Sequence, residues 1–357
     1  MSKVLIFSDV HIHPHKRSLD RLQHCLDALE WVFKTAEEQS VDHILFLGDL
    51  FHNRQRIEIL TYHKAFNVFK KYLNGKIKLW LLLGNHDLWY RDKVDINSVA
   101  PFSALPGVTV VDCESTLDIS GHLIDFIPFT LDPIESLNKL LKLRGDNPKK
   151  LLCAHIAIHG AKYNSGMMAD VTVEHDGEVT KVDSSLFSAW DQVFLGHYHL
   201  PQIIQNVEYV GSPLQLSFGE ADQIKHILIY DLETQEKEYI ENNFSPKHLI
   251  IPYDQIKNYE LKNNFIRIVV DDISSSDIVE IKDTLLNEVE VGSLEIKQNI
   301  KKEEDHTVEN AKTILLDENS MFEEYIETVD IGELNREHLL AVGKKICSER
   351  GETELLQ

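Results

Sequence analysis

The sequence has few cysteines and no long apolar run, and both absences exclude classes of protein. Four cysteines occur in 357 residues, far apart and without a C-x-x-C pair. We therefore expect neither a zinc site of cysteines nor a disulfide framework, and we expect the protein to reside in a reducing compartment. The first apolar run meets Ser8-Asp9 almost at once, which does not fit a signal peptide. No segment reaches the roughly 20 apolar residues that span a bilayer. We therefore expect a soluble, cytoplasmic protein without a membrane partner.

Positive charge is scarce in the second half of the chain. Residues 1–150 hold 19 Lys/Arg and 19 Asp/Glu, whereas residues 151–357 hold 17 Lys/Arg against 39 Asp/Glu, which accounts for the whole net charge of −22. Such an acidic protein is a poor general binder of polyanions. If the substrate is a nucleic acid, we expect local basic patches in the first half to contact it, helped by bound metals.

Hydrophobic periodicity divides the chain into three domains. Residues 1–241 alternate short apolar strands with amphipathic helices, which predicts an α/β domain of two packed sheets flanked by helices. Residues 247–312 predict a small α/β capping domain, and residues 313–357 an acidic helical tail.

Within these domains the pattern predicts particular elements. An amphipathic helix is expected over 18–38, and four strand-like runs are rich in Val, Ile and Tyr: 108–111, 122–127, 203–210 and 226–231. In the small domain, strands are expected at 265–270 and 292–298, with a helix at 276–288 between them.

Polar side chains follow five of the apolar runs, each just past the end of a predicted strand. They are Asp9 and His11, Asp49, the run Asn85-His86-Asp87, His155, and the pair His197 and His199. Ligands bind at this edge of layered α/β folds. Carboxylate, amide and imidazole groups together suit two divalent cations, with imidazole favouring manganese, iron or zinc over magnesium alone.

Each of these residues taken singly is most simply a turn residue or a helix cap. The ordered set of five is far more specific, and it predicts a dimetal site for hydrolysis of phosphate esters.

The order D-x-H, G-D, G-N-H-D, H, G-H-x-H resembles the calcineurin-like metallophosphoesterase superfamily. More narrowly, Gly48-Asp49-Leu50-Phe51-His52 and the segments 209–213 and 218–220 are similar to the G-D-L-F-H and Y-x-G-S-P … F-G-E segments of SbcD-type nucleases. The resemblance covers about residues 1–240 well. Asp9-Val10-His11-Ile12-His13 departs from the D-x-H-L-G of that family after its first His.

The resemblance implies two metal ions, with manganese preferred. One would be held by Asp9, His11, Asp49 and His199, the other by Asp49, Asn85, His155 and His197, with Asp49 bridging. His86 would be the catalytic histidine, oriented by Asp87. His52 would position DNA. Arg54, two residues later, could contact a phosphate, but a position in a solvated loop explains an arginine there equally well.

The implied function is a DNA nuclease, a 3′-to-5′ exonuclease on duplex ends and an endonuclease on single strands or hairpins. It would act in DNA repair or recombination with an SbcC-like coiled-coil ATPase, on which the tail 313–357 would dock. The alternatives are a metallophosphoesterase for small phosphodiesters or phosphoproteins, and a scaffold that mainly recruits a partner. A homodimer is expected through the apolar face Ala65, Phe66, Phe69 and Leu73 and the segment 96–105, unless both simply cover the sheet.

Overall fold

The structure is a computed structural model that describes residues 2–145, 150–164, 167–175, 178–271 and 291–299, with isolated positions at 278, 282 and 285. Residues Met1–Asn299 form one compact unit and Ile300–Gln357 a second. The predicted tail at 313–357 lies outside the described residues, as does most of the predicted helix at 276–288.

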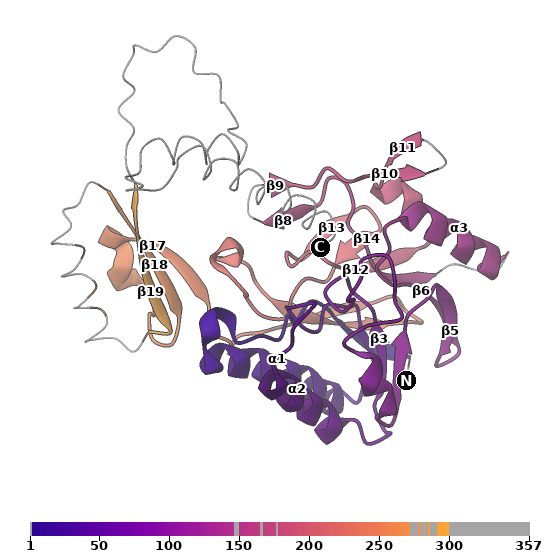
Figure 1. Ribbon diagram of the computed structural model, residues 1–357, viewed down its shortest axis with the longest axis horizontal. Coiled ribbons are helices and arrows are strands. Elements are labelled where there is room, and N and C mark those ends of the chain that lie inside the picture. The colour runs from indigo at the N-terminus through magenta and orange to yellow at the C-terminus, as the bar shows by residue number, and fades with distance from the viewer. Residues whose placement is uncertain are drawn as a thin grey trace, which may run out of the picture. The chain divides into compact units, whose positions relative to one another are not determined.

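Two six-stranded sheets form the first part of the chain (Figure 1). In the first sheet β1, β2, β3 and β4 run parallel, β15 runs antiparallel to β1, and β16 runs antiparallel to β15 and therefore in the direction of β1. Its strands in spatial order are β16 (Lys237–Glu241), β15 (His226–Asp231), β1 (Lys3–Phe7), β2 (His43–Phe46), β3 (Lys78–Leu82) and β4 (Val108–Val111).

The second sheet has a parallel centre and antiparallel edges. Its strands in spatial order are β13 (Gln202–Ile204), β14 (Val207–Tyr209), β12 (Gln192–Gly196), β7 (Leu151–His155), β6 (His122–Ile127) and β5 (Ser115–Ile119). The single strand predicted at 203–210 is wrong, because Gln205 adopts a positive φ of 58° and the chain turns back there between β13 and β14.

Side-chain alternation along the strands creates the layers. In β1, Val4 and Ile6 belong to a core cluster that also holds Phe126 and Cys153 of the second sheet, so this cluster joins the two sheets. Leu5 and Phe7 point to the other face, where they belong to the cluster that covers the first sheet.

Helices cover the outer faces of the two sheets. The covering cluster of the first sheet includes residues of α1 (Leu19–Glu38) and α2 (Ile59–Tyr72). Leu137 and Leu140 of α3 (Pro133–Arg144) pack with buried residues of the second sheet. The predicted helix at 18–38 is thus confirmed. The Ser18 side chain caps it by accepting a hydrogen bond from the Arg21 N–H. The predicted fold class, a two-sheet sandwich flanked by helices, is likewise confirmed.

The apolar face of α2 packs on the sheet rather than lying at the surface. Ala65 and Phe69 are fully buried, and Leu73 is 2 % exposed, all within the core cluster of the first sheet. For Ala65, Phe69 and Leu73 the alternative that they simply cover the sheet therefore holds, whereas Phe66 is partly buried and Ile96 is 51 % exposed, so pairing through Phe66 and the segment 96–105 stays a prediction. A fully buried side chain has no area left to offer a partner.

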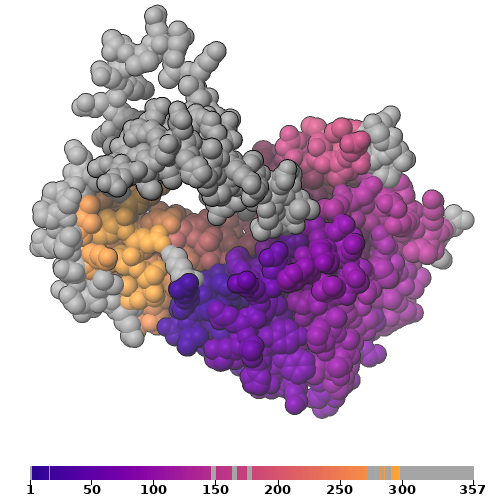
Figure 2. All heavy atoms as spheres, in the orientation of Figure 1, coloured from indigo at the N-terminus to yellow at the C-terminus, as the bar shows by residue number. Residues whose placement is uncertain are grey.

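Smaller elements decorate the sandwich. Two hairpins that the sequence did not predict follow β7: β8 (Lys162–Asn164) with β9 (Met167–Met168), and β10 (Thr172–His175) with β11 (Glu178–Lys181). The 3₁₀ helices are η1 (His15–Arg17), η2 (Ala100–Ala104), η3 (Ser184–Phe187), η4 (Phe218–Glu220) and η5 (Tyr253–Asn258). Figure 2 shows the indigo, purple and magenta atoms of the first part of the chain packed into one continuous body.

A parallel three-stranded sheet follows, made of β17 (His248–Pro252), β18 (Phe265–Asp271) and β19 (Ser293–Asn299). The strands predicted at 265–270 and 292–298 match β18 and β19, and β17 is an additional strand. Positions 278, 282 and 285 are helical, as the predicted crossover requires. No helix in the described part of the chain is long and apolar enough to cross a membrane.

A buried carboxylate fastens α3 to the second sheet. Asp125 of β6 is fully buried; its Oδ2 lies 3.1 Å from Arg144 Nε and accepts a 2.7 Å hydrogen bond from Trp190 Nε1. Its Oδ1 accepts one of 2.6 Å from the Thr116 hydroxyl. Removing one member of such a pair strands the other charge away from water.

We therefore expect Asp125→Ala to lower the free energy of unfolding by about 3–5 kcal/mol. Urea denaturation followed by circular dichroism measures this. Asp191→Ala, at an exposed position beside β12, is the matched control and should stay within about 0.5 kcal/mol of the wild type. Equal midpoints for the two variants would contradict the role of Asp125.

Candidate metal centre

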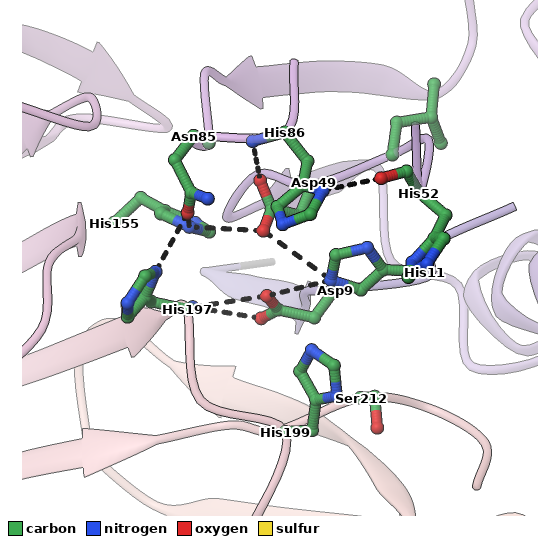
Figure 3. Close-up of polar contacts among 12 residues, drawn as sticks. Asp9, His11, Asp49, His52, Asn85, His86, His155, His197, His199 and Ser212 are labelled. Carbon is green, nitrogen blue, oxygen red and sulfur yellow. Dashed lines mark hydrogen bonds and ion pairs between the residues drawn. The ribbon is translucent and has the colours of Figure 1, made fainter. Parts of the chain in front are cut away.

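The predicted ligand residues lie at the carboxyl ends of five strands from both sheets. In the first sheet Asp9 and His11 follow β1, Asp49 follows β2 and Asn85 follows β3; in the second, His155 ends β7, and His197 and His199 follow β12. Because β1, β2 and β3 are parallel neighbours, as are β7 and β12, these ends share one edge of each sheet. Figure 3 shows the side chains converging there from both sheets.

Four of these residues have left-handed backbone conformations. The φ angles are 54° at Asp9, 47° at His11, 62° at Asp49 and 101° at His197. Such angles are uncommon outside glycine and cost of the order of 1–3 kcal/mol each. Each turns the chain sharply at its strand end, so that Asp9 and His11 each bring a ligand atom to one site, within 4.8 Å of each other.

Two glycines leave room for the ligands to approach. A Cβ on Gly84 would collide with the Asp49 carboxylate, and one on Gly196 would collide with the Ser8 hydroxyl and the Leu47 carbonyl. The glycines of the G-N-H-D and G-H-x-H motifs are therefore required by packing at the site.

The first group of candidate ligands is Asp9, His11 and His199. Each offers one ligand atom, and these atoms lie within 4.8 Å of one another. Both ring nitrogens of His11 are buried and have no hydrogen-bond partner among the described residues. A buried imidazole without a partner is costly, and a cation bound at one nitrogen would satisfy it.

The second group is built around the Asn85 amide. Its Oδ1 lies 3.1 Å from His155 Nε2 and 2.9 Å from His197 Nδ1. The Asp49 carboxylate lies between the two groups, since its Oδ2 is 3.5 Å from His11 Nε2 and 3.5 Å from His155 Nε2 (Figure 3). Asp49 thus faces both groups, with the Asp9 carboxylate close to His155 as well, and the donor set fits two divalent cations.

The electrostatics around His155 favour added positive charge. Burial lowers the pKa of His155, but the nearby Asp49 and Asp9 carboxylates outweigh it and raise that pKa to about 9. His155 Nδ1 lies 2.6 Å from the Leu47 carbonyl, which can only accept, so Nδ1 carries a proton and Nε2 faces the carboxylates. A divalent cation would supply at Nε2 the positive charge that the proton otherwise supplies.

His86 is oriented by a backbone carbonyl. Its Nδ1 lies 2.5 Å from the His52 oxygen, so Nδ1 donates and Nε2 is left for a reacting group. The Asp87 carboxylate instead accepts hydrogen bonds from the backbone N–H groups of Asp49, Leu50 and Gly84 at 2.8, 3.0 and 2.9 Å. The expectation that Asp87 orients the His86 ring is corrected accordingly. Burial, followed by the Asp49 charge, raises the pKa of Asp87 to about 7.

His52 lies beside the centre, where its ring forms a third candidate group with His11 and His86, with ligand atoms within 4.8 Å of one another. Its ring centroid is 5.4 Å from that of His11 and 5.8 Å from that of His86. Burial and the neighbouring His86 lower the pKa of His52 to about 4, so the ring is neutral at pH 7. Arg54, two residues on, is partly buried.

His199 is supported by a carboxylate that the sequence pattern did not predict. Its Nδ1 lies 2.9 Å from Glu220 Oε1, while Glu220 Oε2 lies 2.8 Å from the buried Lys225 ammonium. Lys225 also donates to the His199 carbonyl at 2.7 Å and the Ser212 hydroxyl at 2.9 Å. A carboxylate behind a histidine ligand fixes its tautomer and raises its basicity. The F-G-E segment that contains Glu220 was visible in the sequence, but its partner was not.

We expect the contact from Glu220 to set the affinity of the centre for metal. Replacing the buried pair with apolar residues of similar size is tolerated by folds, so Glu220→Met with Lys225→Met should fold but bind Mn²⁺ about 10- to 100-fold more weakly. The matched double variant Glu220→Gln with Lys225→Met keeps an acceptor for His199 and should bind nearly as the wild type does. Titration calorimetry compares the two. The same affinity in both would refute the role of Glu220.

Comparison with known proteins agrees with this geometry. Residues 2–201 match the calcineurin-like phosphoesterase family. The chain is 24 % identical over 331 residues to exonuclease subunit 1 of Enterobacteria phage T4, covering 91 % of this chain and 92 % of that protein. It is 26 % identical over 279 residues to the SbcD component of the SbcCD nuclease of Escherichia coli K12, covering 67 % of each chain. The identity is also 26 % to the SbcD component of the Staphylococcus epidermidis nuclease, over 67 % of this chain and 70 % of that one.

The family match spans more than half of the chain, and its segment contains every one of the candidate ligands. The chain therefore belongs to the calcineurin-like phosphoesterase family and is a metal-dependent phosphodiesterase with nucleases among its relatives.

Proposed function

We propose that this protein is a two-metal DNA nuclease, a 3′-to-5′ exonuclease on duplex ends and an endonuclease on single strands or hairpins. It would process DNA ends in the cytoplasm during repair or recombination. The observation that carries the proposal is the position of Asp49 between two histidine-containing ligand groups, with His86 beside them. Relatives that match over most of their own length are named as nucleases, which supports DNA as the substrate.

The proposed ligands are Asp9, His11, Asp49 and His199 for one ion, and Asp49, Asn85, His155 and His197 for the other, manganese being the preferred metal. Two divalent ions in such a site polarise a phosphate and lower the pKa of a bound water. The backbone N–H of His86 donates a hydrogen bond of 2.7 Å to Asp49 Oδ1, which holds that carboxylate in place. With its Nδ1 held by the His52 carbonyl, His86 presents Nε2 to protonate or stabilise the departing sugar oxygen.

His52 and Arg54 are the proposed contacts to DNA next to the centre. His52 packs against His11 and His86, so a strand that reaches the metals passes it. Arg54 carries positive charge at the same place, where the first half of the chain is neutral overall. Local charge of this kind offsets the acidity of the whole protein, because salt screens charges more than about 10 Å away.

Two other functions remain as alternatives. A metallophosphoesterase for small phosphodiesters or phosphoproteins would use the same centre without needing His52 or Arg54. A scaffold would need only the fold; the complete set of seven candidate ligands argues against it.

A comparison of two variants tests the function and the roles together. His86→Ala should keep both metals and lose cleavage by about 10²- to 10⁴-fold, the range for a general acid or base, whereas Asp49→Ala should lose metal. Metal analysis of the purified proteins is combined with Mn²⁺-dependent cleavage of duplex, hairpin and single-stranded DNA and of bis(4-nitrophenyl) phosphate. Equal metal loss in both variants would sink the assignment of roles. Hydrolysis of the small ester alone by the wild type would favour the first alternative.

The proposed partners are an SbcC-like ATPase with a coiled coil and a second copy of the chain. Residues 313–357 hold 11 Asp/Glu against four Lys/Arg, which suits a basic protein surface better than DNA. Their apolar positions, including Phe322, Tyr325, Leu339 and Ile346, need a surface to cover. Short helices of this kind are marginal alone, and we propose that they fold on the base of the coiled coil. Analytical ultracentrifugation of the wild type measures the mass in solution, and a dimer would have twice the 41.1 kDa mass of the chain.

Deleting 313–357 should abolish co-purification with the ATPase, because it removes the docking helices. Cleavage of single-stranded DNA with Mn²⁺ should persist, since the candidate ligands all lie within residues 9–199. Pull-down and nuclease assays on the truncated and full-length proteins measure both. A truncated protein that unfolds or loses its metals would place the tail in the core instead.

A further inference from the structure

Two aromatic side chains project from the loop that follows the metal centre. Trp89 is 44 % exposed and Tyr90 45 %, and their ring centroids lie 6.5 Å apart at 78°. The loop is fastened at its base, because the Trp89 N–H donates to the Ile96 carbonyl at 3.0 Å and the Ser98 N–H to the Asp87 carbonyl at 2.8 Å. The aromatic pair is therefore presented to solvent by a closed loop rather than by a loose one.

One cationic group lies over this pair, and a second, Arg54, lies near Arg91, the residue that follows Tyr90. The Lys93 ammonium lies 5.4 Å from the centre of the Tyr90 ring. Arg54 has two buried guanidinium nitrogens, Nε and Nη2, with no hydrogen-bond partner among the described residues. Burial and the nearby charge of Arg91 both lower the pKa of Arg54. The Asp49 carboxylate acts in the opposite direction on that pKa, but neither nitrogen donates a hydrogen bond to an anion among the described residues.

The pair lies close to His86 along the chain. Trp89 follows His86 by three residues, so their Cα atoms are at most about 11 Å apart. Stacked nucleotides repeat at about 3.4 Å along a strand. An aromatic ring at this place therefore meets the base about one to three nucleotides from the centre.

We infer that Trp89 and Tyr90 are a stacking platform for an unpaired base of the DNA substrate, and that Arg54 binds the adjoining phosphate. The inference rests on the proposed nuclease function and deepens it. Bases inside a duplex are already stacked on both faces, so the platform selects single strands and frayed ends. Aromatic stacking of this kind contributes about 1–3 kcal/mol per base and tolerates any sequence.

Charge distinguishes DNA from a second copy of the chain as the occupant. The loop itself is balanced, since Asp92 and Asp95 accompany Arg91 and Lys93. The excess positive charge comes from Arg54, whose buried nitrogens have no hydrogen-bond partner among the described residues. Two copies that met here would bring two such guanidinium groups together, whereas a phosphate would satisfy each of them.

The test compares a single-stranded 20-mer with bis(4-nitrophenyl) phosphate, using the full-length protein in Mn²⁺. For Trp89→Ala, the ratio of kcat/KM on the 20-mer to kcat/KM on the small ester should fall about 5- to 100-fold, the equivalent of losing one stacked base. Trp89→Phe should recover most of the loss. Tyr253→Ala removes another aromatic that is 45 % exposed, on η5, and serves as the matched control with an unchanged ratio.

A fluorescence measurement reports the contact directly. In the His86→Ala background the 20-mer should quench tryptophan emission, and Trp89→Phe should abolish the quenching, because Trp31, Trp80 and Trp190 are all partly or wholly buried. An unchanged ratio for Trp89→Ala, or quenching that survives Trp89→Phe, would overturn the platform alone. A Trp89→Ala protein with a changed sedimentation coefficient would show that the surface binds a second copy. A wild type that cleaves only the small ester would overturn the nuclease function as well.

Discussion

The centre depends on one buried carboxylate that binds backbone rather than metal. Asp87 accepts three backbone hydrogen bonds, two from the turn after β2 and one from the turn after β3. These bonds hold Asp49 in its left-handed conformation between the two ligand groups. Because a carboxylate forms strong hydrogen bonds with backbone N–H donors, the three hydrogen bonds to Asp87 offset part of the backbone strain at the ligand residues. Backbone hydrogen bonds of the fold thus fix the turn that carries Asp49.

The positions of the candidate ligands could be predicted from the sequence because each ends an apolar run. Parallel strands bring such ends to one edge, so Asp9, Asp49 and Asn85 meet for a reason that the linear pattern already contains. The two-sheet sandwich followed from the number of short strands. These inferences needed only the hydrophobic periodicity, the order of the motifs along the chain and the types of the residues in them.

Other features depend on which surface a helix, strand or loop packs against, and the sequence pattern does not contain that information. The apolar stripe of α2 looks the same whether it covers a sheet or a partner, and Phe69 proved to be core. Asp87 follows His86 in the chain, yet its carboxylate points to the backbone of another turn. Glu220 reaches His199 only because the chain folds back after β14. A loop that returns to the site is not visible in local spacing.

The pairing of β1 with β15 also constrains when the protein can fold during its synthesis. Lys3 lies opposite Asp231 in that ladder, so the strand made first keeps an unpaired edge until most of the two-sheet domain has left the ribosome. At about 5–20 residues per second this takes of the order of 10–45 s. Asp9 meets the His197 N–H across 188 residues of sequence. The enzyme therefore cannot form a complete metal centre, or cleave nucleic acid, while the ribosome is still translating the first half of the chain.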